Sequence, residues 1–273
     1  MKTTYFKDKV IIITGASSGI GLASAKLFGS YGAKVVMAAR SLDKMKELAP
    51  EVSSNPDNVL CVKCDVSDEL DCQNLIKKTV DRFGRIDILV NNAGVSMRAM
   101  FADLDLNVLR RLMDVNFWGT VYCTKYALPY LVEAKGSVVG VISVAGYTPL
   151  PARTGYCSSK YAIRGFLDTI RTEHLRDGLH VLVFAPGYTA SNVRNAALTA
   201  DGTPQGHTPL KEEKLMSAEK VAYKLAKMIY KRRSQLILSM IGRATVLGHT
   251  IYPHFADWAT YKYVSKEPDS PFK

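Results

Sequence analysis

Short apolar runs alternate with helical stretches along most of the chain, and this alternation constrains the fold more than any other feature. Runs rich in Val, Ile and Leu predict buried strands at residues 9–13, 33–39, 58–63, 86–90, 137–142 and 180–184. Because strands and helices take turns, the strands should run parallel, with right-handed crossovers that place helices on both faces. We therefore predict an α/β fold with a doubly wound parallel sheet in three layers.

Proline, glycine and N-capping residues predict several helix boundaries. Pro50 should follow a short helix over residues 42–48. Ser67 should begin a helix that ends near Gly84, and two helical stretches should flank Asn116.

The length of 273 residues suits one domain, and no repeat or linker divides it. We expect residues 1–240 to form this domain, with a last strand at 236–238. Residues 241–273 form an apolar, aromatic extension that should pack on the domain or on a neighbouring subunit. Segment 189–216 is polar and contains Gly and Pro, which indicates a mobile excursion near a binding site. We expect residues 191–216 to close over substrate.

The chain is basic, with 36 Lys and Arg against 25 Asp and Glu and a formal net charge of +11. Such a balance is compatible with nucleic acid, an acidic membrane surface or an anionic ligand. No nucleic-acid-binding module is visible, and no basic run is interleaved with aromatic residues. We therefore expect no nucleic-acid partner.

The five cysteines form no disulfide framework. Cys61 and Cys64 make a Cys-x-x-Cys pair, but no second pair or His pair completes a zinc site. They lie on a predicted strand, where their side chains would point to opposite faces. We expect reduced cysteines, no bound metal and a cytoplasmic location, since neither a signal peptide nor a membrane-length apolar run is present.

A glycine-rich turn lies between the first strand and the first helix and reads Thr-Gly-Ala-Ser-Ser-Gly-Ile-Gly over residues 14–21. Glycines let a backbone approach a pyrophosphate closely, and the N-terminus of the following helix attracts its charge. A plain strand-to-helix corner remains the alternative for this turn taken alone.

The end of the second strand indicates which dinucleotide is bound. NAD-binding proteins usually carry an acidic residue there that accepts from the ribose 2′-hydroxyl, whereas this chain has Ala39, Arg40 and Ser41. A guanidinium suits a 2′-phosphate, so we expect NADP, although Arg40 as a solvated surface residue is the alternative. Asp65 would bind the adenine amino group, or would form a helix N-cap with Ser67.

Tyr156 and Lys160 are one helical turn apart and share a helix face. A phenol has an ordinary pKa of about 10, and a fixed positive charge lowers it by favouring the phenolate. The pair therefore has the composition of a general acid/base, with the phenol as the group that exchanges the proton. The same spacing is common on helix surfaces, and a surface pair without a catalytic role is the alternative for these two residues taken alone.

Further polar residues follow predicted strands at the sheet edge where such folds bind ligands. Ser143 follows the fifth strand, residues 91–94 (Asn-Asn-Ala-Gly) follow the fourth, and Pro186 with Gly187 follows the sixth. Chance placement of all these residues at one edge is improbable.

In this order, the motifs resemble those of the short-chain dehydrogenase/reductase family, and the resemblance extends over residues 9–238. It rests on residues 14–21, Asp65, residues 91–94, Asn116, Ser143, Tyr156, Lys160, Pro186, Gly187 and Thr189. The resemblance implies a Rossmann-type fold, a nicotinamide cofactor and a homodimer or homotetramer.

The resemblance also implies a role for each catalytic residue. Tyr156 is the acid/base, and Ser143 holds the substrate oxygen. Lys160 lowers the pKa of the phenol and binds the nicotinamide ribose, and Asn116 positions a water that relays protons through Lys160. Thr189 holds the carboxamide. The expected cofactor-binding residues are Gly15, Ser17, Ser18, Gly19, Ile20, Gly21, Arg40, Ser41, Asp65, Val66, Asn92, Ala93, Gly94, Tyr156, Lys160, Pro186, Gly187 and Thr189.

The predicted function is hydride transfer between NADP(H) and a small-molecule ketone or secondary alcohol. The extension at 241–273 is similar to the branch of the family that acts on steroid or long-chain lipid ketones, so the substrate should be apolar. Two alternatives stay open, a nucleotide-binding scaffold without turnover and a lipid-binding protein in peripheral contact with a membrane.

Overall fold

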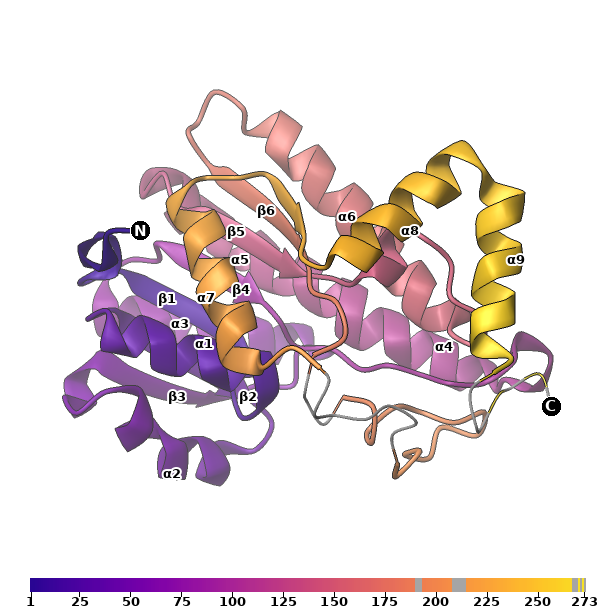
Figure 1. Ribbon diagram of the computed structural model, residues 1–273. Coiled ribbons are helices and arrows are strands. Elements are labelled where there is room, and N and C mark those ends of the chain that lie inside the picture. Colours follow the sequence, from indigo (N-terminus) through magenta and orange to yellow (C-terminus); the bar gives the residue numbers. More distant parts are fainter. Residues whose placement is uncertain (190–192, 208–214, 267–269, 271, 273) are drawn as a thin grey trace.

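The strands pair side by side in one parallel sheet. In this computed structural model, which describes residues 1–189, 193–207, 215–266, 270 and 272, the strands are β1 Val10–Thr14, β2 Lys34–Ala39, β3 Val59–Lys63, β4 Ile88–Asn91, β5 Ser137–Val141, β6 His180–Ala185 and β7 Gln235–Ile237. Their order is β3–β2–β1–β4–β5–β6–β7 (Figure 1). The predicted doubly wound parallel sheet is confirmed.

The α-helices are α1 Gly19–Ser30, α2 Leu42–Val52, α3 Glu69–Phe83, α4 Leu106–Leu112, α5 Gly119–Glu133, α6 Thr154–Glu173, α7 Ala218–Tyr230, α8 Met240–Ile251 and α9 Pro253–Val264. Short 3₁₀ helices span Thr3–Phe6, Pro56–Asn58, Phe101–Asp103 and Val144–Gly146. A π-helical segment, Met113–Trp118, joins α4 to α5. The three layers of Figure 1 follow, with α1, α2 and α7 on one face of the sheet and α3, α5 and α6 on the other.

Strand β1 shows why the strands are continuous apolar runs. All its residues are buried. Val10 and Ile12 pack into the core beneath α3, α5 and α6, whereas Ile11 and Ile13 pack into the core beneath α1, α2 and α7. Since a fully buried side chain of this size contributes about 1.5–3 kcal/mol, both faces of the strand stabilise the sheet.

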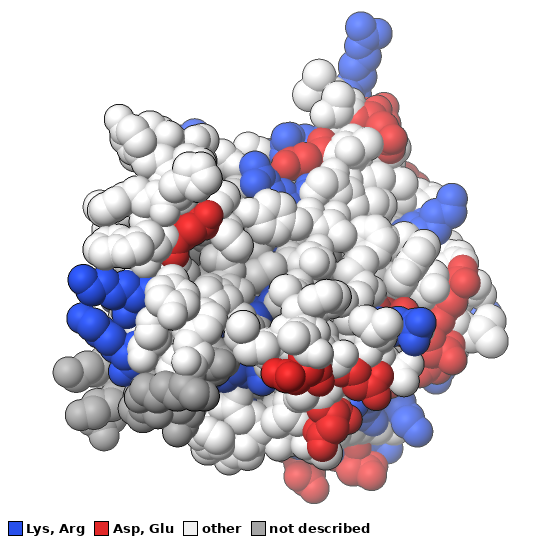
Figure 2. Space-filling model, turned by 90° about the vertical axis from the view of Figure 1, so that its right-hand side faces the viewer, with Lys and Arg blue, Asp and Glu red and all other residues white. Residues whose placement is uncertain are grey.

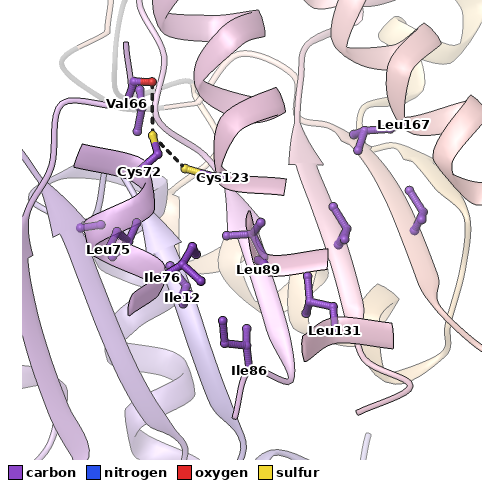
Figure 3. Packing of buried hydrophobic residues seen from close by; sticks show 14 of the residues in the cluster. Ile12, Val66, Cys72, Leu75, Ile76, Ile86, Leu89, Cys123, Leu131 and Leu167 are labelled. Atoms are coloured by element: carbon purple, nitrogen blue, oxygen red, sulfur yellow. Dashed lines mark hydrogen bonds between the residues drawn. The ribbon is translucent and has the colours of Figure 1, made fainter. Parts of the chain in front are cut away.

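The core beneath α3 and α5 contains thiols as apolar packing groups (Figure 3). The Cys72 Sγ donates to the carbonyl oxygen of Val66 at 3.5 Å, and the Cys123 Sγ lies 3.6 Å from the Cys72 Sγ. All five cysteines are free. Cys61 and Cys64 face opposite layers, as the sequence predicts.

Two helix boundaries differ from the prediction. Helix α2 continues through Pro50 because Val52 is buried at its end, while the Pro50 ring lies on the exposed side. Helix α3 begins after Asp68 rather than at Ser67, since the Asp68 carboxylate accepts from the Asp71 N–H and forms the cap.

The described part of the segment between β6 and α7 is anchored to the segment that follows β4. The Leu198 N–H donates to the Ser96 carbonyl at 2.8 Å, and the Arg98 N–H donates to the Leu198 carbonyl at 2.8 Å. Leu198 is buried there. Residues 193–207 therefore lie beside the segment that follows β4. Residues 191–192 and 208–214 of the predicted lid lie outside the described residues.

Helices α8 and α9 form a hairpin at one side of the molecule (Figure 1). Gly242 is the buried residue of α8, and it packs against Val144 and Ile237. Helix α9 contributes no buried residue among those described. No described helix combines the length and apolar character needed to cross a membrane.

Candidate active site

The site lies where the chain leaves the carboxyl ends of β1 and β4. These strands are neighbours in the sheet, but the chain continues from them toward opposite edges. Such a switch point opens a crevice outside the strand ends, which is where doubly wound sheets bind ligands. Most predicted site residues follow the strands β1 to β6 at this edge, whereas Asn116 lies in the π-helical segment and Tyr156 and Lys160 lie in α6.

The glycine turn forms a cradle that side chains would fill. Gly15 and Gly19 have φ of +67° and +53°, a conformation that favours glycine. A Cβ on Gly21 would lie 2.3 Å from the Gly15 carbonyl oxygen. Ser18 precedes α1 without capping it through its side chain. The first-turn N–H groups of α1 thus remain available for an anion such as a pyrophosphate.

Asn92, a predicted cofactor contact, braces this turn. Its Nδ2 donates to the Thr14 carbonyl at 2.9 Å. The Thr14 hydroxyl oxygen accepts from the N–H groups of Asn92 and Ala93, both at 3.0 Å. The amide therefore positions the turn by joining β1 to β4.

Arg40 lies at a cavity of about 500 Å³ beside the end of β2. The cavity is lined by Arg40, Ser41, Leu42, Asp43, Lys44 and Lys63. Lys63 pairs in register with Ala39 across the β2–β3 ladder, which brings a second positive charge to the position expected for a 2′-phosphate. Lys63 and Lys44 belong to no sequence motif that predicts a cofactor contact. A charged residue at the end of an otherwise apolar strand was the available signal for Lys63.

Asp65 is held in a turn before α3. Its Oδ1 accepts from the Ser67 N–H at 3.1 Å and from the Ser67 hydroxyl at 2.7 Å. Burial raises the pKa of Asp65, but the hydrogen bonds from Ser67 and the charges of Arg40 and Arg111 outweigh this effect. The pKa of Asp65 is therefore below its usual value. Asp65 is therefore a fixed carboxylate near Arg40, and it does not cap α3.

Tyr156 and Ser143 come together from α6 and from the end of β5. Ser143 begins the short 3₁₀ helix after β5, and its Oγ accepts from the Ala145 N–H at 3.2 Å. Burial raises the pKa of Tyr156, whereas a hydrogen bond with Ser143 and the charge of Arg153 lower it. The net direction is upward, so the protein's own groups favour the protonated phenol.

Lys160 is almost fully buried, at 4% exposure. Its Nζ lies 5.7 Å from the ring centroid of Tyr156 and donates to the Val141 carbonyl at 3.1 Å. Burial lowers the pKa of Lys160 to about 8. The two residues are neighbours, as predicted.

Asn116 lies inside the π-helical segment and is fully buried. Its Oδ1 accepts from the Val95 N–H at 2.8 Å, and its Nδ2 donates to the Val95 carbonyl at 3.0 Å and to the Ser159 Oγ at 2.9 Å. A Cβ on Gly94 would lie 3.0 Å from the Asn116 Oδ1 and 3.4 Å from the Lys160 Nζ. The structure thus brings Asn116, Gly94 and Lys160 together. The side-chain amide is engaged by Val95 and Ser159, and the Asn116 backbone carbonyl accepts from the Thr120 hydroxyl at 2.8 Å.

The chain after β6 completes the edge. Pro186 and Gly187 follow the strand directly, and the Thr189 hydroxyl donates to the Gly187 carbonyl at 3.1 Å. Val66 lies on the other side of the site, buried against Gly119 at the start of α5. Both groups of predicted cofactor contacts are at the predicted edge of the sheet.

Sequence comparisons identify related proteins. A family model described as short chain dehydrogenase matches residues 9–201. The mouse protein named dehydrogenase/reductase SDR family member 7B is 32% identical over 240 residues, which are 86% of this chain and 74% of that protein. The Sesamum indicum protein named 11-beta-hydroxysteroid dehydrogenase A is 41% identical over 189 residues, which are 68% of this chain and 53% of that protein.

Solved structures of similar fold include two with bound nucleotides. An alcohol dehydrogenase from the archaeon Thermococcus sibiricus, complexed with 5-hydroxy-NADP, aligns with a TM-score of 0.74 and 25% identity over 85% of this chain and 96% of that one. A short-chain dehydrogenase/reductase from Burkholderia phymatum in complex with NAD has a TM-score of 0.81 and 22% identity over 92% of this chain and 95% of that one, a likeness of fold. With the family model spanning well over half of its length, this chain belongs to the short-chain dehydrogenase/reductase family.

Proposed function

We propose that this oxidoreductase transfers a hydride between NADP(H) and a ketone or secondary alcohol on an apolar substrate, with Tyr156 as the acid/base. The meeting of Ser143, Tyr156 and Lys160 beside the glycine cradle carries this proposal. A proton-transfer pair next to a dinucleotide cradle is the arrangement that hydride transfer to a carbonyl requires.

The residues present fit a nicotinamide dinucleotide. Gly15 and Gly21 leave a cradle that a Cβ would fill, and the start of α1 has no side-chain cap. The bound dinucleotide would supply or accept the hydride. Thr189, Gly94 and Lys160 lie near the edge where its nicotinamide end is expected, and Arg40 lies at the opposite end.

Tyr156 and Ser143 would both contact the substrate oxygen, with different roles. The Ser143 hydroxyl would hold that oxygen, while the Tyr156 phenol donates a proton to it in reduction or removes one in oxidation. Because burial raises the pKa of Tyr156, the phenol is held in the protonated form that reduction uses. The Asn116 Nδ2 donates to the Ser159 Oγ at 2.9 Å, and this hydrogen bond holds α6 against the π-helical segment.

Preference for the phosphorylated cofactor is supported by the charge around the cavity at Arg40. Arg40, Lys44 and Lys63 give it three positive charges against the single carboxylate of Asp43. No acidic residue ends β2, where an NAD-binding protein would hold the ribose 2′-hydroxyl.

An apolar substrate is supported by the surroundings of Tyr156. Its ring packs against a cluster that includes Met97, Leu112 and Leu198, all buried. The hydroxysteroid dehydrogenase name of the sesame relative points to the same class of substrate.

A cofactor and substrate screen tests the proposal. Oxidation of NADPH and of NADH would be followed by absorbance with a panel of ketones that includes sterols and 3-keto lipids, and the reverse reaction with the matching alcohols. We expect turnover with at least one apolar ketone and a preference for NADPH. Tight NADPH binding without turnover of any substrate would instead support the scaffold alternative.

A second candidate role, contact with an anionic membrane surface, is favoured by the hairpin of α8 and α9. Its exposed apolar side chains are Met240, Ile241, Leu247, Ile251, Tyr252, Phe255, Trp258, Tyr261 and Tyr263. Charged side chains are sparse over much of this side of the molecule (Figure 2). Arg243, Lys262 and Lys266 are exposed on or next to the hairpin, which matches anionic headgroups. Co-sedimentation with anionic and neutral vesicles tests this role, and binding to neither kind excludes it.

A further inference from the structure

Arg153 occupies a position that a helix start does not favour. It is the residue before α6, where Ser, Thr, Asp or Asn usually accept from the first N–H groups, and it forms no side-chain cap. A positive charge at a helix N-terminus also opposes the helix dipole. A residue that breaks a local rule in this way is expected where another requirement outweighs helix stability.

The contacts of Arg153 show what that requirement is. Its Nη1 donates to the Ser96 Oγ at 2.9 Å and to the Met97 carbonyl at 3.0 Å. The adjacent Ala152 carbonyl accepts from the Ala99 N–H at 3.0 Å. The start of α6 is thereby joined to the segment after β4, which forms the apolar wall beside Tyr156.

The same guanidinium carries a charge that its contacts do not neutralise. Both acceptors are uncharged, and among the described residues Arg153 forms no ion pair. Arg153 is half-buried and precedes Tyr156 by three residues, so both lie on one side of α6. Incomplete exposure limits screening by solvent.

We propose that Arg153 is a positioning residue of the active site, which clamps the segment after β4 to the start of α6 and sets a permanent positive charge beside the Tyr156 phenol. This inference rests on the proposed acid/base role of Tyr156.

The groups around the Tyr156 phenol shift its pKa in opposite directions, and Arg153 is one of those that lower it. Burial raises the pKa of Tyr156, and the Ser143 hydrogen bond and the Arg153 charge lower it, while Cys157 and Tyr188 raise it. Lys160 is near the ring but is itself held to the Val141 carbonyl. Arg153 is therefore a permanent cation that opposes the effect of burial.

The test is the pH dependence of kcat/KM for alcohol oxidation in the wild type, Arg153→Gln and Arg153→Lys. Oxidation needs the phenolate, so its rate rises as pH passes the pKa of Tyr156. Loss of the charge in Arg153→Gln should move the midpoint up by about one pH unit, and Arg153→Lys should stay near the wild type. Below the midpoint, Arg153→Gln should then be about tenfold slower.

Two control variants separate the effect of the Arg153 charge from the effect of its hydrogen bonds to the segment after β4. Arg171→Gln removes an equal charge from α6, where Arg171 is paired with Asp168, and should leave the midpoint unchanged. Ser96→Ala removes one acceptor of the clamp without a change of charge, so kcat should fall while the midpoint stays.

An unshifted midpoint in Arg153→Gln, or an equal shift in Arg171→Gln, would overturn the proposal. A titration of phenolate by ultraviolet absorbance, each variant against its own Tyr156→Phe counterpart, reports the same midpoint without turnover. If Arg153→Gln fails to fold by circular dichroism, Arg153→Met and this titration take its place. Absence of turnover in the wild type would refute the proposed function, while the titration would still decide the role of Arg153.

Discussion

Tyr156 depends on neighbours that reach it from separate elements. Ser143 comes from the end of β5, and Lys160 lies one turn further along α6. The phenol is partly desolvated, which raises its pKa and keeps its proton available. At the scale of single residues, the site thus combines a buried acid with polar groups that hold the substrate oxygen.

Replacement of Tyr156 by Phe tests the acid/base directly. Phe keeps the ring and its packing against the apolar cluster but has no proton to transfer. We expect kcat to fall by about 10²- to 10⁴-fold, with NADPH affinity unchanged, because general acid/base catalysis contributes that much. Turnover and a fluorescence titration of NADPH measure the two quantities. A variant that kept more than about a tenth of kcat would show that another group transfers the proton.

Arg40→Ala should reduce the preference for NADPH over NADH. A charge-assisted contact with an ionised group contributes about 1.5–3 kcal/mol, and partial exposure reduces that figure. The ratio of kcat/KM for the two cofactors should therefore fall by about tenfold or more. Lys63→Ala should lower the ratio in the same direction by less, since an ammonium cannot make the bidentate contact with a phosphate that a guanidinium makes. Lys46→Ala, on the exposed side of α2 and outside the cavity, is the matched control. An unchanged ratio in Arg40→Ala would place the 2′-phosphate elsewhere.

At the scale of elements, the glycine turn and the start of α1 are held by β4. Asn92 and Ala93 bind Thr14, so the turn cannot move without disturbing two strands. The π-helical segment has a similar effect on the other side of the site. It places Asn116 where its amide joins the segment after β4 to α6. Insertions of this kind are frequent at functional sites because they re-aim one side chain in an otherwise regular helix.

Gly21→Ala should disrupt the cradle. Its Cβ would lie 2.3 Å from the Gly15 carbonyl oxygen and 2.6 Å from the Asn92 Nδ2, so the turn must shift. We expect NADPH affinity to fall by tenfold or more and stability to fall by about 1–3 kcal/mol, as overpacking typically costs. Gly165→Ala in α6 is the control, since beyond the backbone of its own helix and its chain neighbours its Cβ would meet nothing within 4 Å, and it should be neutral or stabilising. Wild-type affinity in Gly21→Ala would contradict the assignment of the turn.

At the scale of the whole molecule, the hairpin of α8 and α9 adds little to the buried core. Gly242 is its buried residue among those described, and its large apolar side chains face solvent. Exposed aromatic residues in such number are typical of a surface that another body covers. The predicted homodimer or homotetramer and the cytoplasmic location remain predictions, and light scattering of the purified chain measures the first.

A chain that ends at Leu238 should still fold. Thermal unfolding followed by circular dichroism should show a cooperative transition within a few degrees of that of the full chain, since the core beneath the sheet is retained. The shortened chain should not co-sediment with anionic vesicles that bind the full chain. Vesicle binding by the shortened chain would place the lipid contact outside the hairpin. Loss of the cooperative transition would show that α8 is part of the core.

The amino-acid sequence by itself determined the layer architecture and the edge that carries the site. Continuous apolar strands such as β1 must be covered on both faces, and parallel strands bring their carboxyl ends to one edge. The glycine turn and the spacing of Tyr156 and Lys160 are local features, so they could be identified without coordinates. Helix boundaries were less certain, because burial of Val52 carries α2 past Pro50 and a competing cap moves the start of α3.

Only the tertiary structure decided which distant residues act together. Lys63 reaches the Arg40 cavity through the β2–β3 register, and Arg153 reaches Ser96 across 57 positions of the chain. The direction of the pKa of Tyr156 also depends on burial, which no local pattern reports. Sequence spacing determines which side chains share a helix face or a strand face, whereas contacts across elements and desolvation arise only when the sheet and its helices pack.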